Sequence, residues 1–214
     1  MVLKLIGFTV STCTRRVATV LEEKDIPYEL IQIDVSKGEH KSPAHLEKQP
    51  FGQVPILDDD GFILYESRAI ARYIALKYRD QGTPLIPDPS DLQAWAKFEQ
   101  AASIELSNFD PFASGIAVEK VFKPIHGIES SQEMIELYAA TLASKLHGYE
   151  TILSKQKYLA GDEITLADLF HLPYGAFLGK LGYSFLESGE YPNVTRWWTD
   201  ISSRPSWQAA KDRA

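Results

Sequence analysis

The chain of 214 residues is 44% hydrophobic and 24% charged, which is typical of a globular protein and argues against disorder. Its formal net charge of −7 argues against a nucleic-acid partner, because phosphate binding requires a basic surface. One cysteine cannot form an internal disulfide, and no apolar run has the length of a membrane span or a signal-peptide core. We therefore expect a cytoplasmic protein without membrane association.

The first eighty residues alternate between strand and helix patterns. Residues 2–8 (VLKLIGF) and 28–34 (YELIQID) indicate strands on either side of a helix from Ser11 to Lys24. Strand patterns at 54–57 and 62–65 flank the turn DDDG, which predicts a hairpin, and a helix follows from about Ser67. This order predicts a small mixed sheet covered by helices.

A proline-rich segment, QGTPLIPDPSD (81–91), divides the chain. Beyond it the spacing of apolar residues predicts helices near 89–118, 130–155, 165–179, 193–203 and 205–212, with no strand. We place an α/β domain at 1–80, a linker at 81–88 and an all-helical domain at 89–214.

The stretch GFTVSTCTRRV (7–17) places Ser11 directly before a helix. Serine is a preferred N-cap, because its oxygen accepts a hydrogen bond from an otherwise unpaired backbone N–H. The same helix end favours an anion, so the hydroxyl is alternatively a hydrogen-bond donor to a ligand thiolate. Cys13 shares the helical phase of Val17 and Val20, which predicts a buried, inert thiol.

Two loop segments carry groups that suit a peptide-like ligand. In EHKSP (39–43), His40 and Lys41 are either a solvated pair or the holders of a carboxylate. In PFGQVPIL (50–57), Pro55 marks either a bent edge strand or a cis Val54–Pro55 bond. A cis bond would turn the N–H and C=O of Val54 outward, where an extended peptide could pair with them.

Glu66 and Ser67 open the helix that follows the hairpin. Their structural reading is capping, with Ser67 as the N-cap and the carboxylate of Glu66 at the positive helix end. Their functional reading is that Ser67 binds an α-carboxylate while Glu66 neutralises an ammonium group. A ligand with an amino-acid terminus carries both groups.

The helical half contains folding signals and no catalytic pattern. Thr165-x-x-Asp168 is a variant of the capping box, with Asp in place of Glu or Gln. The five histidines lack the spacing of metal ligands, so we expect no metal.

Five motifs together resemble those of cytosolic glutathione transferases, and their sequences are most similar to the phi class. They are STCTRRV, GEHKSP, PFGQVPIL, ESRAIARYIA and LAGDEITLADL. The resemblance implies a thioredoxin-like N-terminal domain that binds glutathione, followed by an all-helical domain that contributes a hydrophobic substrate site. It implies glutathione as co-substrate, a homodimer and no metal.

The resemblance also implies residue roles. Ser11 would be the catalytic hydrogen-bond donor to the glutathione sulfur. Glutathione would be held by His40, Lys41, Gln53, Val54, Pro55 (in cis), Glu66 and Ser67. We expect the hydrophobic second substrate near Val10, Phe112, Tyr174 and Phe177. Phe51 falls where related chains insert an aromatic side chain into the partner subunit.

Three further functions remain open on the sequence. Besides conjugation to electrophiles or reduction of organic hydroperoxides, the chain could carry hydrophobic ligands without catalysis. A thiol transferase dependent on Cys13 is another alternative, although the family's cysteine enzymes align that residue with Ser11. A non-enzymatic interaction module is the last, and no appended domain supports it.

Overall fold

The computed structural model describes residues 2–213. Their contacts group them into two compact units: a first unit of residues 2–86 with 204–213, and a second unit of residues 87–203. The division after residue 86 falls inside the predicted linker.

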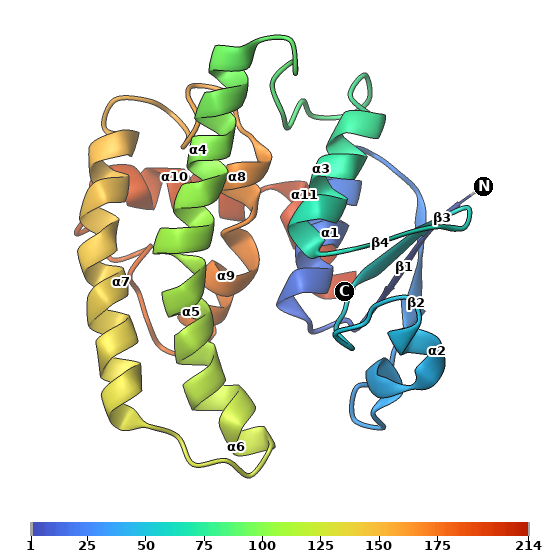
Figure 1. Ribbon diagram of the computed structural model, residues 1–214. Helices are drawn as coiled ribbons and strands as arrows, with labels where there is room; N and C mark the ends of the chain where they lie inside the picture. The colour runs from blue at the N-terminus through green and yellow to red at the C-terminus, as the bar shows by residue number, and fades with distance from the viewer. Residues whose placement is uncertain (1, 214) are drawn as a thin grey trace. The chain divides into compact units, whose positions relative to one another are not determined.

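The first unit is built on a four-stranded mixed sheet (Figure 1). Its strands are β1 (Leu3–Gly7), β2 (Tyr28–Gln32), β3 (Ile56–Asp59) and β4 (Phe62–Tyr65), in the spatial order β2-β1-β3-β4. β1 is parallel to β2 and antiparallel to β3, and β3 is antiparallel to β4. The predicted mixed sheet is thereby confirmed.

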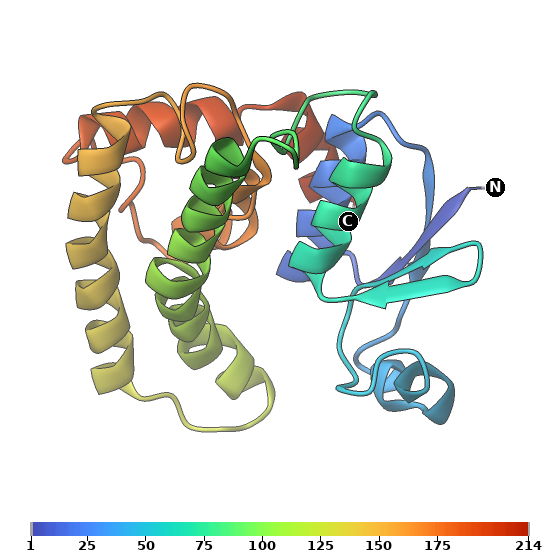
Figure 2. The ribbon, with the colours of Figure 1, turned by 45° about the horizontal axis from the view of Figure 1, so that its top comes forward.

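Helices α1 (Thr12–Glu23) and α3 (Ser67–Lys77) lie side by side and cover one face of this sheet (Figures 1 and 2). Their apolar faces and the inward-facing strand residues form the core, in which Leu5, Val17, Leu57 and Ile70 are fully buried. A single turn of 3-10 helix, Glu39–Lys41, and the short helix α2 (Pro43–Leu46) occupy the segment that the sequence analysis treated as a loop.

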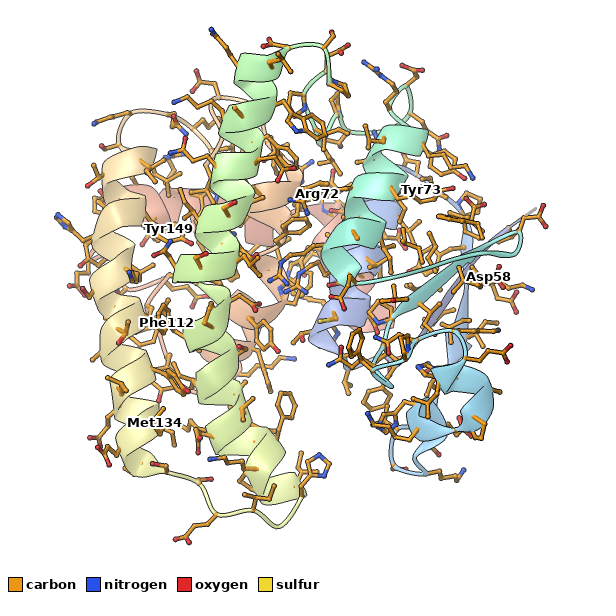
Figure 3. All side chains as sticks on the ribbon, in the orientation of Figure 1. Asp58, Arg72, Tyr73, Phe112, Met134 and Tyr149 are labelled. Atoms are coloured by element: carbon orange, nitrogen blue, oxygen red, sulfur yellow. The ribbon has the colours of Figure 1, made fainter. Side chains whose placement is uncertain are left out.

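The predicted hairpin is present between β3 and β4. Asp60 and Gly61 both have positive φ, 55° and 89°, as a type I′ turn requires. The Gly61 N–H donates to Asp58 Oδ1 at 2.8 Å, and Tyr73 on α3 donates its hydroxyl to Asp59 at 2.5 Å (Figure 3 labels Asp58 and Tyr73). The tyrosine thus ties the hairpin to α3.

The second unit is helical. Its helices are α4 (Leu92–Asn108), α5 (Asp110–Ala117), a π-helical turn (Val118–Phe122), α6 (Lys123–Ile125), α7 (Gln132–Leu153), α8 (Leu166–Leu169), α9 (Leu172–Lys180) and α10 (Pro192–Ser202). Two predicted helices, 89–118 and 165–179, are each broken in the structure, at Phe109 and at Phe170–His171. A proline lies in the first turn after each break. Since proline has no N–H to donate to the preceding turn, the earlier helix cannot continue through it.

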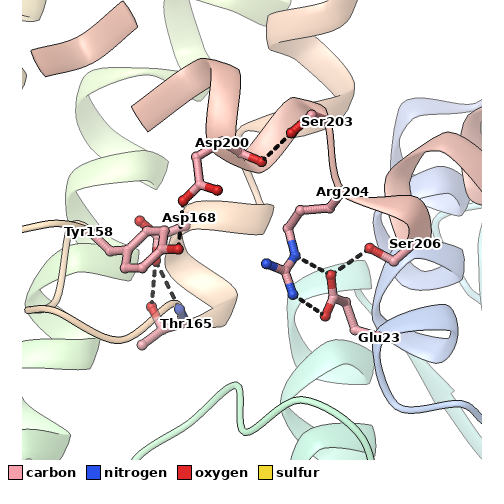
Figure 4. Close-up of polar contacts among 8 residues, drawn as sticks. All are labelled: Glu23, Tyr158, Thr165, Asp168, Asp200, Ser203, Arg204 and Ser206. Carbon is pink, nitrogen blue, oxygen red and sulfur yellow. Dashed lines mark hydrogen bonds and ion pairs between the residues drawn. The ribbon is translucent and has the colours of Figure 1, made fainter. Parts of the chain in front are cut away.

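Helix α11 (Pro205–Arg213) packs against α1 in the first unit, whereas the sequence analysis placed it with the helical domain. Trp207 and Ala210 of this helix are buried, and a buried carboxylate on α1 binds its start. Glu23 accepts hydrogen bonds from the Arg204 guanidinium through both oxygens, with Nη2 2.8 Å from Oε2, and from Ser206 at 2.5 Å (Figure 4).

Asp168 is the polar centre of the second unit. It is completely buried, and its carboxylate accepts the N–H groups of Leu159 and Thr165 and the indole N–H of Trp197, each at 2.9 Å (Figure 4 shows the Thr165 contact). The capping box predicted from Thr165 and Asp168 is therefore confirmed. In the described part of the chain, none of the helices combines the length and apolar character needed to cross a bilayer.

Candidate active site

Ser11 is the N-cap of α1. Its backbone is extended (φ −67°, ψ 125°), and its Oγ accepts the Thr14 N–H at 3.3 Å. A hydroxyl accepts through its lone pairs and still has one proton to donate. The two readings of Ser11 are therefore compatible, because the same oxygen can cap the helix and donate its O–H to a ligand.

The prediction that Cys13 is buried is wrong: the residue is partly exposed. Arg16 fills the neighbouring interior position and is only 1% exposed. Its Nη1 donates to Cys13 Sγ at 3.4 Å and to Ser67 Oγ at 2.9 Å. The helical phase places Cys13 on the same side of α1 as Val17 and Val20, but it does not determine how deeply the thiol is buried. The side chain that packs beside the first turn is the polar Arg16 and not an apolar residue.

The start of α3 differs from the sequence reading by one residue. Glu66, with a φ of 69°, is the N-cap residue, although its side chain makes no capping bond and is exposed. Ser67 is the first helical residue and is buried, with its Oγ accepting from Arg16. Ser67 therefore keeps its O–H proton for a ligand, while the Glu66 carboxylate reaches solvent.

His40 and Lys41 lie in the 3-10 turn. Lys41 is exposed and donates through Nζ to the Phe51 carbonyl at 2.9 Å. Within residues 2–213, His40 Nδ1 is buried without a hydrogen-bond partner. Burial lowers the pKa of His40 below its usual value, and the charges of Lys41 and His45 lower it further.

The loop before β3 contains a cis Val54–Pro55 bond, as the resemblance implies. The Gln53 N–H donates to Gln49 Oε1 at 3.0 Å, and the Gln53 C=O lies 2.8 Å from His45 Nε2. Gln49 and His45 are 2% and 5% exposed. Neither residue was predicted from the sequence as part of the site. The Ser42–Pro43 helix start was a signal for His45 in the first turn of α2, whereas Gln49 lies beyond the end of that helix, where its N–H donates to the His45 carbonyl.

Gly52 brings two of the predicted segments together. Its φ is +62°, and a Cβ there would lie 2.6 Å from Lys41 Cδ and 2.9 Å from the His40 carbonyl oxygen. Only glycine permits this approach, so residues 49–53 lie directly against His40 and Lys41.

The sheet register brings the remaining segments to one edge. Ile6, near the end of β1, pairs with Ile56 at the start of β3, and Ile56 pairs with Tyr65 at the end of β4. Three connections therefore lie at the same edge of the sheet: the one from β1 to Ser11, the one from Val54 into β3, and the one from β4 to Glu66. Arg16 joins the first turns of α1 and α3 there.

The residues predicted to contact a hydrophobic substrate fall in both units. Val10 belongs to the first unit and is exposed. In the second unit, Phe112 on α5 and Tyr174 and Phe177 on α9 are partly exposed (Figure 3 labels Phe112). The Phe177 ring lies 6.2 Å from that of Phe122, so the second unit carries an aromatic pair at this face of α9.

Two other expectations concern Phe51 and metal ions. The Phe51 side chain is 63% exposed, with its ring edge-on to Tyr65 at 6.4 Å. Among residues 2–213 there is no group of three or more His, Cys, Asp or Glu side chains that could hold a metal ion.

Comparison with known proteins identifies the fold and its family. The model of the glutathione S-transferase N-terminal domain matches residues 1–76, and that of the C-terminal domain matches residues 109–205. The chain belongs to the glutathione S-transferase family. Its thioredoxin-like first domain and helical second domain are those of the family, and it is a transferase with glutathione as its co-substrate.

The plant relatives of this transferase are of the phi class. It is 51% identical over 197 residues to the Arabidopsis thaliana glutathione S-transferase PM239X14, covering 91% of this chain and 89% of that protein. A glutathione S-transferase of Hypomyces subiculosus is 46% identical over the full length of both chains. The crystal structure of glutathione transferase F7 from Populus trichocarpa matches with a TM-score of 0.92 and 42% identity, covering 99% of this chain and 98% of that one.

Proposed function

We propose that Ser11 donates a hydrogen bond to the glutathione sulfur and thereby stabilises its thiolate. The thiolate then attacks hydrophobic electrophiles, reduces organic hydroperoxides, or does both. The observation that carries this proposal is the geometry of Ser11, which caps α1 through an accepted bond and keeps its own proton free. The twelve-residue helix behind it directs its positive end towards the same place.

The Ser11 hydrogen bond and the N-terminus of α1 together are strong enough to ionise the glutathione thiol near neutral pH. A free thiol has a pKa of about 8.5, and lowering it by about two units requires roughly 2.7 kcal/mol. One charge-assisted hydrogen bond contributes about 1.5–3 kcal/mol. A helix N-terminus contributes roughly 0.3–1 kcal/mol more. No general base is required, because the thiol proton can leave to solvent before the attack.

The rest of glutathione is held by groups at the same edge of the sheet. Lys41 and His40 bind the glycyl carboxylate through charge-assisted hydrogen bonds. Gln53 and the backbone of Val54, next to Pro55, pair with the peptide as an added strand would. At the γ-glutamyl end, Ser67 binds the carboxylate and Glu66 the ammonium group.

The second substrate binds beside aromatic side chains of the helical domain. We assign this role to Phe112, Tyr174 and Phe177, and we assign the aliphatic Val10 of the thioredoxin-like domain as a further contact of the same substrate. The enzyme acts in the cytoplasm as a homodimer, to which the exposed Phe51 contributes an aromatic side chain. A ligand-carrier role without catalysis would show as tight binding of hydrophobic ligands with negligible turnover.

Replacing Ser11 by alanine is expected to lower turnover of an aryl-halide substrate at least about tenfold, with little change in glutathione affinity. The thiol of bound glutathione should then ionise at higher pH, because its hydrogen-bond donor is gone. Steady-state kinetics as a function of pH measures both effects.

Two controls separate donation from capping and from thiol chemistry. Ser11→Asp keeps an N-cap acceptor but has no proton to donate, so it should be as inactive as Ser11→Ala while remaining more stable. Cys13→Ser addresses the thiol-transferase alternative, which the partial exposure of Cys13 and its contact with Arg16 favour. Unchanged turnover in Ser11→Ala, together with loss of activity in Cys13→Ser, would reverse the assignment.

Binding of S-methylglutathione is expected to tighten as the pH falls through the range of His40. This ligand has no thiol, and its carboxylates remain ionised, so imidazole protonation dominates. Burial, followed by the charge of Lys41, lowers the pKa of His40, so the free protein favours its neutral form more than a free imidazole does. A bound carboxylate favours the imidazolium, so affinity should rise up to about tenfold between about pH 7.5 and 5.5. Calorimetry on the wild type and on His40→Gln tests this, since the variant should lose the pH dependence.

A further inference from the structure

The two polar groups of the Gln53 backbone are both bonded to buried side chains. Gln49 Oε1 receives its N–H at 3.0 Å, and His45 Nε2 lies 2.8 Å from its C=O. Since a carbonyl oxygen only accepts, Nε2 must carry the proton of this bond. Gln53 is thus held on both sides by side chains that are themselves almost fully enclosed.

His45 and Gln49 are in turn held by short-range contacts. The Ser42 side chain accepts the N–H of His45, and the Gln49 N–H donates to the His45 carbonyl at 2.8 Å. The Gly52 N–H donates to the Gln49 carbonyl at 2.9 Å, which closes the turn before Gln53. The pair therefore forms a rigid bracket around one peptide unit of an otherwise irregular loop.

Within the described residues, the backbone of the next residue, Val54, lacks such bonds. Among residues 2–213, no backbone hydrogen bond of the loop uses the N–H or the C=O of Val54, which is partly exposed. Val54 is the residue whose backbone we assign to the glutathione peptide. If its neighbour were free to rotate, the loop would have to be ordered on binding, and that ordering would weaken affinity.

We propose that His45 and Gln49 are positioning residues for glutathione: by binding both backbone groups of Gln53, they keep the Val54 N–H and C=O directed to the ligand. They touch neither the ligand nor the sulfur. Their effect is therefore on glutathione affinity and not on the chemical step. The inference rests on the glutathione site proposed above.

Two matched pairs of variants test the bracket. His45→Met and Gln49→Met remove the donor and the acceptor at similar size, whereas His45→Gln and Gln49→Glu keep an N–H or an oxygen near the same place. We expect each methionine variant to raise the Kd for S-methylglutathione and the KM for glutathione about five- to tenfold, with kcat within about twofold of wild type. The conservative variant at each position should recover most of the affinity.

A merely structural role would lower the melting temperature of the methionine variants while leaving the Kd of the folded protein unchanged, and this result would overturn the proposal. So would equal weakening by the conservative and the methionine variants. A wild-type protein that fails to bind S-methylglutathione would instead refute the glutathione site itself.

Hydrogen exchange in the wild type provides a test that requires no variant to fold. The Gln53 amide should exchange slowly in the free protein, because it is bonded to Gln49. The Val54 amide should exchange quickly, and should slow at least about tenfold when S-methylglutathione is added. A Val54 amide that is already protected without ligand, or that the ligand does not affect, would contradict the bracket.

Discussion

Replacing Asp168 by alanine is expected to lower the free energy of unfolding by about 4 kcal/mol or more, which amounts to a large part of a domain's stability. The carboxylate is the acceptor for the N–H groups of Leu159 and Thr165, the Thr165 hydroxyl and the Trp197 indole. Each buried donor left without a partner costs about 1–3 kcal/mol. Four donors at this cost give about 4–12 kcal/mol, and we take the lower end because a water molecule in the space left by the side chain satisfies part of them.

Burial raises the pKa of Asp168, and the hydrogen bonds oppose that shift. The donors thus offset the cost of placing this carboxylate in the interior. Urea unfolding followed by tryptophan fluorescence measures the loss, since Trp197 and Trp198 are among the four tryptophans and both are buried in the second unit. Asp162→Ala is the control: this exposed carboxylate accepts the Lys157 N–H at 3.1 Å, and its loss should cost under about 1 kcal/mol. Equal effects of the two variants would contradict the role of Asp168.

Glu23→Leu is expected to lower the free energy of unfolding by about 2–4 kcal/mol and to release α11 from α1. Only 3% of the Glu23 side chain is exposed, and the substitution removes the carboxylate that accepts hydrogen bonds from Arg204 and Ser206. Arg204 is 24% exposed, so it can partly rehydrate, which keeps the cost below that of a fully buried pair. Thermal unfolding gives the loss, and faster proteolysis after residue 203 reports the release of the helix.

The double variant Glu23→Leu/Arg204→Met is the matched control, because it removes the guanidinium charge together with the carboxylate that it binds. It should be more stable than Glu23→Leu alone, and failure to recover stability would show that the pair is not the cause. Acid provides a second check. Burial raises the pKa of Glu23, but bonds to Arg204, Ser206 and Thr83 outweigh it and hold the pKa below its usual value. The contribution is therefore present above the ordinary pKa of a glutamate and is lost as the pH falls through the lowered one.

Where neighbouring residues decide the structure, the sequence was sufficient. The turn at Asp60–Gly61, the helix start at Ser11 and the capping box at Asp168 follow from contacts within a few residues. The succession along the chain of the four strands and of helices α1 and α3 followed from hydrophobic patterns of the same range. The motifs around Ser11, His40, Val54 and Glu66 were sufficient for the family resemblance.

Where distant residues decide it, only the tertiary structure was informative. Glu23 and Arg204 are separated by 181 positions, and nothing near α11 indicates that it belongs with α1. Arg16 donates to Ser67, 51 positions away, and this contact between the first turns of α1 and α3 has no signal in either local sequence. From the sequence, His45 and Gln49 look like ordinary loop residues. Only the folded loop shows that both bind the backbone of Gln53. Local signals settle which element forms, because they depend on backbone bonds within a turn, whereas burial and pairing depend on which surfaces meet after the chain has folded.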